Sequence, residues 1–107
     1  MPPAGEYEHL GCFVDSKADR VLGHTLKSPN MTAAMCLDHC NKRGAAYMAT
    51  QYGHECWCSR QQDLDYQRHG VGTCEMFCLG DETETCGGRD AFDLYKLEWP
   101  GISTDPE

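Results

Sequence analysis

Eight cysteines in 107 residues constrain this chain more than any other feature of its sequence. The cysteines occur as Cys36-x3-Cys40, Cys56-x-Cys58, Cys74-x3-Cys78 and Cys86, with Cys12 alone upstream. An even number of cysteines in a short chain indicates disulfides in an oxidising compartment and metal ligation in a reducing one. The spacing of the two closest pairs helps to decide between these interpretations.

Cys36 and Cys40 suit one face of a helix, where residues four apart are separated by about 6 Å. Cys56 and Cys58 suit one face of a strand, where residues two apart are separated by about 6.6 Å. A helix laid over this strand can form two side-by-side disulfides. Both the uncrossed pairing (Cys36 with Cys56) and the crossed one remain open. Zinc is disfavoured, because a C-x-C pair splays poorly around one tetrahedral ion.

Length and charge narrow the class of protein. A chain of this length is expected to form one domain with a small core, which disulfides stabilise by about 2 to 4 kcal/mol each. The net charge of −8 argues against nucleic acid and anionic membrane surfaces as partners. No apolar run approaches the roughly 18 residues of a membrane span. We therefore expect a secreted, extracellular domain that needs no cofactor.

The domain is predicted to cover residues 7–97. The first residues lack the basic and apolar regions of a signal peptide, so residues 1–6 are interpreted as a non-native start or a linker. Residues 98–107 contain two prolines and few side chains to bury, which is typical of a linker. The chain is thus expected to be a piece of a larger secreted protein.

One helix and several strands are expected. Thr32 is a good N-cap, residues 33–43 contain strong helix formers, and Gly44 suits the C-terminal cap. Residues 7–14 and 91–97 alternate as strands do, and residues 59–72 form a long polar loop.

A hairpin is expected at residues 47–58, with a two-residue turn at Gly53 and His54. This register pairs Gln51 with Cys56 and Ala49 with Cys58, so that all four lie under the helix. The opposite face would then carry Met48, Thr50, Tyr52, Glu55 and Trp57.

Five segments carry a family resemblance: Gly11-Cys12-Phe13-x-Asp15; Asn30-Met31-Thr32 before Cys36-x3-Cys40; Tyr52-Gly53-x-Glu55-Cys56-Trp57-Cys58; Cys74-x3-Cys78-x-Gly80-x5-Cys86-Gly87-Gly88; and Leu94-Tyr95. In this order they closely resemble the WSC domain over about residues 7–97, with every cysteine in register. The family is named for fungal cell-wall stress sensors. Similar domains occur in Kremen receptors and on secreted carbohydrate-active enzymes.

The resemblance implies a PAN/apple-like α+β fold, in which a small, disulfide-stapled antiparallel sheet is crossed by one main helix. It implies the pairs Cys12–Cys74, Cys36–Cys56, Cys40–Cys58 and Cys78–Cys86. It also implies binding of wall polysaccharides such as β-glucans or xylans, and protein contacts in some members. Where the family's last strand usually reads Asn-Arg-Leu-Ser-Val-Tyr, this chain has Arg89-Asp90-Ala91-Phe92-Asp93-Leu94-Tyr95. Its specificity is expected to differ if that strand borders the ligand.

Aromatic side chains are the first candidates for ligand contact, because the C–H faces of sugars stack on rings that have a polar edge. Tyr52, Trp57 and Tyr66 are the predicted contacts, whereas Tyr47 is expected in the core. The competing interpretation is that the outward face of the hairpin is a second core layer. The polar side chains expected to bind sugar hydroxyls are Gln51, His54, Glu55, Asp65 and His69.

Other chemistry finds little support. Pairing of all eight cysteines leaves no thiol nucleophile, and no G-x-S-x-G motif occurs. The acidic stretch at residues 81–84 does not match the spacing of a calcium loop. Asn30-Met31-Thr32 is a possible glycosylation acceptor.

The sequence therefore predicts a non-catalytic carbohydrate-binding module, tethered to an enzyme or a wall protein, that recognises cell-wall or matrix polysaccharide. The alternative is a protein-interaction module of a receptor or wall-sensor ectodomain.

Overall fold

The computed structural model describes residues 7–97. Both predicted linkers, residues 1–6 and 98–107, lie outside the described residues. The five strands of the main sheet, in spatial order, are β1 (Tyr7–Val14), β7 (Ala91–Leu97), β3 (Tyr47–Gln51), β4 (Glu55–Ser59) and β2 (His24–Lys27). Their pairings are all antiparallel. A small second sheet pairs β5 (Phe77–Cys78) with β6 (Asp81–Thr85).

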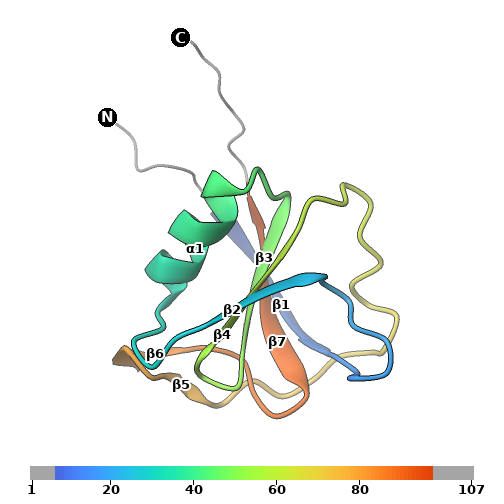
Figure 1. The fold of residues 1–107 in the computed structure, drawn as a ribbon. Coiled ribbons are helices and arrows are strands. Elements are labelled where there is room, and N and C mark those ends of the chain that lie inside the picture. Colours follow the sequence, from blue (N-terminus) through green and yellow to red (C-terminus); the bar gives the residue numbers. More distant parts are fainter. Residues whose placement is uncertain (1–6, 98–107) are drawn as a thin grey trace, which may run out of the picture.

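The helix α1 (Ala33–Lys42) lies on one side of the main sheet and packs on β3 and β4 (Figure 1). Thr32 Oγ1 accepts a hydrogen bond from the Met35 amide, as expected of an N-cap. At the other end Gly44 has a φ of 70°, and the Gly44 and Ala45 amides donate to the carbonyls of Asn41 and Cys40. These are the two bonds of a Schellman cap, so both predicted ends of the helix are confirmed to within one residue.

The register of the β3–β4 hairpin differs from the prediction by one residue. Gln51 lies opposite Glu55 and Met48 opposite Cys58, so the turn contains three residues, 52–54. Gly53, with a φ of 76°, lies so close to β5 that an added Cβ would stand 2.7 Å from the Phe77 carbonyl oxygen. The Gly53 carbonyl also accepts a hydrogen bond from the Leu79 amide, so the turn packs against a distant segment that no local sequence signal reports.

The shifted register exchanges the two faces of β3. Met48 and Thr50, rather than Ala49 and Gln51, lie on the helix side together with Cys56 and Cys58. Ala49 packs with Trp57 on the opposite side. The predicted placement of Ala49 and Gln51 beneath the helix is therefore wrong, whereas that of Trp57 away from the helix is confirmed.

The sheet has a core layer on each face. Between helix and sheet lie Met31, Cys36, Leu37, Cys40, Ala45, Met48, Cys56, Cys58, Cys78, Cys86 and Leu97. On the other face lie Phe13, Val21, Leu22, Ala46, Tyr47, Ala49, Trp57, Leu64, Phe92 and Leu94. Val21, Leu22 and Leu64 come from the connections before β2 and after β4, which cover this face as loops. The outward face of the hairpin is thus the second core layer that the sequence analysis named as the competing interpretation.

The eight cysteines form four disulfides: Cys12–Cys74, Cys36–Cys56, Cys40–Cys58 and Cys78–Cys86. The middle two join α1 to β4 with Cα separations of 5.3 and 5.4 Å, in the uncrossed arrangement. No cysteine is free. The sulfurs of Cys36, Cys40 and Cys56 lie within 4.8 Å of one another, but each already belongs to a disulfide.

One helix on a mostly antiparallel sheet, stapled by disulfides, is the α+β class that was predicted. Within residues 7–97 no helix is long and apolar enough to cross a bilayer.

Candidate functional site

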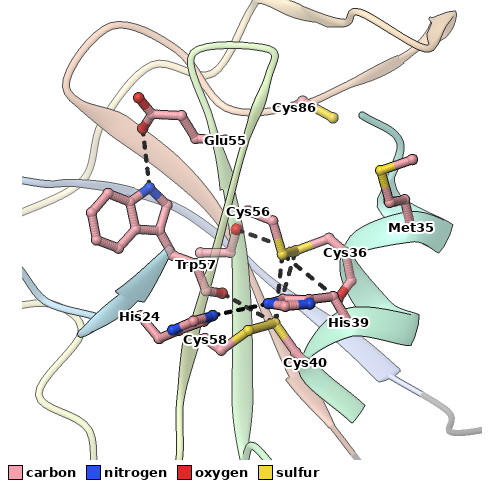
Figure 2. The surroundings of a disulfide bond; sticks show 12 residues. His24, Met35, Cys36, His39, Cys40, Glu55, Cys56, Trp57, Cys58 and Cys86 are labelled. Carbon is pink, nitrogen blue, oxygen red and sulfur yellow. Dashed lines mark hydrogen bonds between the residues drawn. A yellow bond between two sulfur atoms is a disulfide. The ribbon is translucent and has the colours of Figure 1, made fainter. Parts of the chain in front are cut away.

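Trp57 lies in the second core layer and is only 8% exposed. Its indole N–H donates to Glu55 Oε1 at 3.0 Å (Figure 2). The guanidinium of Arg20 lies 4.7 Å from the centre of the Trp57 ring and donates to Asp15 at 2.6 Å. The ion-paired guanidinium of Arg20 thus covers a face of the Trp57 ring, so that this face is already occupied.

Two of the predicted polar contacts are also buried. Glu55 is 7% exposed and receives the indole N–H, and its second oxygen lies 3.8 Å from Lys27 Nζ and from His54 Nε2. Gln51 is 1% exposed, and its amide atoms have no hydrogen-bond partner within the described part of the chain. His54, at the turn, is half-buried, and its Nδ1 lies 2.9 Å from the Tyr52 carbonyl oxygen.

Of the three predicted residues in the long loop, 59–72, Tyr66 packs against the second core layer. The Tyr66 ring packs against Phe13 with a centroid distance of 5.0 Å and is half-buried. His69 Nε2 lies 3.0 Å from the Asp19 carbonyl oxygen, while Asp65 is exposed. None of these three residues lines the groove that contains Tyr52, which is described next.

Tyr52 differs from the other candidate residues because it lines a groove with a volume of about 670 Å³. The groove is lined by Val14, Asp15, Ser16, Lys17, Ala18, Tyr52, Arg89 and Asp90. It therefore combines an aromatic ring with hydroxyl, ammonium, guanidinium and carboxylate groups. Such a mixture is what a polyhydroxylated ligand needs, because its hydroxyls require donors and acceptors and its C–H faces require a ring.

The backbone around the groove holds Tyr52 and Asp90 in uncommon conformations. Tyr52 has a φ of 57° and Asp90 a φ of 51°, and positive values are rare outside glycine. The Tyr52 hydroxyl donates to Asp90 Oδ1 at 2.8 Å, and the Asp15 amide donates to the Asp90 carbonyl. The hydrogen bond to Asp90 raises the pKa of the Tyr52 phenol, so the phenol remains a neutral donor at physiological pH. Strained residues that are locked together in this way are frequent at binding sites.

Tyr52 is predicted from the sequence, whereas Ser16, Lys17, Arg89 and Asp90, which line the same groove, are not. A signal for two of them was present, since Arg89 and Asp90 open the segment in which this chain departs from the family pattern. The structure shows that this segment does border the groove.

A second exposed surface is apolar and lies on the β5–β6 hairpin. Phe77 is 61% exposed and Leu79 is 59% exposed, with Met76 beside them in the chain. Met76 and Arg89 line a separate depression together with Thr73, Glu75 and Gly88.

Comparison with known proteins places these observations in a family. The sequence profile of the WSC domain matches residues 9–88. A WSC domain-containing protein of Arthroderma benhamiae is 35% identical over 104 residues, covering 87% of this chain and 11% of that protein. Xylosyltransferase oxt of Drosophila melanogaster is 32% identical over 99 residues, covering 88% of this chain and 11% of the enzyme. Kremen protein 2 of Mus musculus is 33% identical over 91 residues, covering 83% of this chain and 20% of that protein.

Proposed function

The chain belongs to the WSC domain family, and from this premise we propose that it is a secreted, non-catalytic carbohydrate-binding module. It recognises cell-wall or extracellular-matrix polysaccharide, such as a glucan or a xylan, in the groove around Tyr52. The observation that carries the proposal is the Tyr52–Asp90 pair, which presents a ring and a hydrogen-bonded carboxylate in one groove.

Two features support the role of an extracellular module. All eight cysteines are paired, which suits an oxidising compartment and leaves no thiol for catalysis. The chain also spans only about a tenth to a fifth of the length of the three relatives described above. One of these is named as a xylosyltransferase and another as Kremen protein 2, so the domain occurs within larger proteins of different kinds. We infer that it tethers a larger protein to a glycan rather than reacting with it.

Within this proposal Tyr52 stacks on the sugar ring, while Asp90, Arg89 and Ser16 hydrogen-bond its hydroxyls. Trp57 and Tyr66 act through packing, because their rings are covered by Arg20 and Phe13. His54 and Glu55 support the turn that carries Tyr52.

The test is a pull-down on insoluble β-glucan and xylan, in which each variant is assayed for both binding and melting temperature. Tyr52→Ala should weaken binding about fivefold with little change in melting, since a stacking ring is worth on the order of 1 kcal/mol. Tyr66→Ala is the matched control, because it removes the same side chain from a packed position. It should lower the melting temperature and leave the affinity of the folded protein unchanged.

The alternative function is a protein-interaction module, and the exposed Phe77 and Leu79 are the observation that favours it. If Tyr52→Ala binds both polysaccharides as the parent does, the groove is not the glycan site. If the parent binds neither polysaccharide, the interaction-module function takes precedence.

A further inference from the structure

A second pocket lies at the other end of the β3–β4 hairpin from Tyr52. Its volume is about 230 Å³, and it is lined by Gly23, His24, Arg43, Ala45, Cys58, Ser59 and Arg60. Three elements meet there: the start of β2, the C-terminal end of α1 and the end of β4. None of the lining residues is acidic, although acidic residues outnumber Lys and Arg by 17 to 9 in this chain.

Within residues 7–97, no carboxylate pairs with either arginine of this pocket. Among residues 7–97, no ion pair involves Arg43 or Arg60, whereas Arg20 and Arg68 pair with aspartates at 2.6 and 2.9 Å. Arg60 uses its Nε to donate to the Arg43 carbonyl at 2.8 Å. That bond fixes the guanidinium beside the helix end while its two terminal nitrogens remain available as donors.

A helix C-terminus ordinarily attracts cations through its unpaired carbonyls. Here the carbonyls of Cys40, Asn41 and Arg43 already accept hydrogen bonds, from the Ala45, Gly44 and Arg60 donors respectively. These three carbonyls are therefore already paired, and the charged side chains that line the pocket are Arg43 and Arg60.

Burial and the positive charges of the two arginines contribute to a lowered pKa of His24. Its Nε2 lies 2.9 Å from Nε2 of His39 on α1, and the two rings are stacked (Figure 2). Desolvation, Arg43, His39 and Arg60 together lower the pKa of His24. The nearby Asp38 and Lys42 on α1 pair with each other at 3.0 Å.

We propose that the pocket formed by His24, Arg43 and Arg60 binds a tetrahedral oxyanion, a sulfate or phosphate group carried as an ester on a larger ligand. Polar side chains from three elements line it, which suits a group with several exposed oxygens, and guanidinium groups bind such oxygens in a bidentate manner. The volume fits one such group and part of the ring that carries it. A metal ion on the two imidazoles is disfavoured, because both arginines would repel it.

The acidic character of the whole chain does not prevent this binding. Charges farther away than about 8 Å are largely screened at physiological ionic strength, whereas the two arginines line the pocket itself. The site is independent of the Tyr52 groove, so a neutral wall glycan and an acidic ester can each be tested without the other.

The experiment is a two-dimensional ¹H–¹⁵N NMR titration of the protein at constant ionic strength. Sodium sulfate, sodium phosphate and sodium chloride are compared, followed by a sulfated chondroitin oligosaccharide and its desulfated counterpart. We expect saturable shifts at residues 23–24, 43–45 and 58–60 with sulfate or phosphate but not with chloride. The sulfated oligosaccharide should bind more tightly than free sulfate, and the desulfated one should leave these residues unshifted.

Matched variants separate this pocket from general charge. Arg43→Gln and Arg60→Gln should each weaken sulfate binding about tenfold or more, because each removes a charge-assisted donor. Arg89→Gln removes the same charge from the Tyr52 groove and should leave sulfate binding unchanged. Arg60→Lys should give an intermediate affinity, since it keeps the charge and loses the bidentate fork.

Two results would overturn the proposal: shifts with sulfate no greater than with chloride, or an equal loss of sulfate binding in Arg89→Gln. Binding of free sulfate and free phosphate without any gain for the sulfated oligosaccharide would leave an anion site but refute the ester ligand. None of these results bears on binding of neutral polysaccharide at Tyr52.

Discussion

The two disulfides between α1 and β4 are expected to stabilise the domain in a coupled way. Cys36–Cys56 and Cys40–Cys58 close overlapping loops with sequence separations of 20 and 18. When one is removed, the other still connects the helix and the strand at a point four residues away on α1 and two residues away on β4. Removing the first bridge therefore opens only the loop of about seven residues that lies between the two bridges. The chain entropy of closing this loop contributes about 2.4 kcal/mol to the free energy of unfolding. Removing the second bridge then opens the full loop, worth about 3.2 kcal/mol.

All four sulfurs are also buried, so each Cys→Ala pair loses a further packing contribution of about 1 kcal/mol. Cys36→Ala with Cys56→Ala should thus lower the free energy of unfolding by about 3 kcal/mol and leave a folded domain. The variant lacking both bridges should lose about 8 kcal/mol, which rivals the whole stability of many small domains.

The assay is guanidinium unfolding at 25 °C, with the remaining disulfides checked by mass after alkylation. If the Cys36→Ala, Cys56→Ala variant is nearly as stable as the parent, the helix packs on the sheet without this disulfide. A variant without both bridges that is as stable as the single-pair variants would refute the coupling.

Three further predictions concern buried or titrating groups. Gln51→Met should raise the free energy of unfolding by about 1 kcal/mol in the same assay, because it removes a buried side-chain amide that has no protein hydrogen-bond partner. A loss of stability would show that this amide does form hydrogen bonds. Because the pKa of His24 is lowered in the folded state, stability should be full above its ordinary value and fall as the pH drops below about 6.5. His24→Gln should reduce this slope, and an unchanged slope would contradict the assignment. Burial, with Asp93 nearby, raises the pKa of Tyr95 to about 12; stability should therefore fall as the pH rises from about 10 towards 12, and Tyr95→Phe should remove that loss.

Local signals in the sequence were sufficient for much of the fold. Thr32 and Gly44 mark the ends of α1 because capping chemistry depends on residues within one turn. Residues 7–14 and 91–97 form β1 and β7 with the predicted bounds, because alternation and flanking loops are also local features. The cysteine spacing indicated that α1 lies on β4, since helix and strand repeats match at that distance.

Features that depend on contacts between distant segments were not predicted. The hairpin turn, which packs against Phe77 at Gly53, has three residues rather than two, and Ala49 and Gln51 therefore lie on the other face of the sheet. The short β2 lacks a clear strand pattern and is defined by its pairing with β4.

The same distinction between local signals and contacts between distant segments applies to the candidate site. Tyr52 was predicted because aromatic residues in turns are often exposed. The burial of Trp57 depends on Arg20, from a loop 37 positions earlier in the chain, and the neighbourhood of Tyr52 and Asp90 depends on β7 returning beside β3. Neither arrangement has a signature within a short sequence window.

Mapping of a soluble wall oligosaccharide on the ¹⁵N-labelled domain tests the central claim most directly. Titration with xylohexaose and with laminarihexaose should shift the amides of Ser16, Tyr52, Arg89 and Asp90 in a saturable way for at least one of the two sugars. Tyr52→Ala should abolish most of these shifts while the remaining spectrum stays that of the folded protein. Saturable shifts centred instead on Phe77 and Leu79, or no shift with either sugar, would contradict the groove as the polysaccharide site.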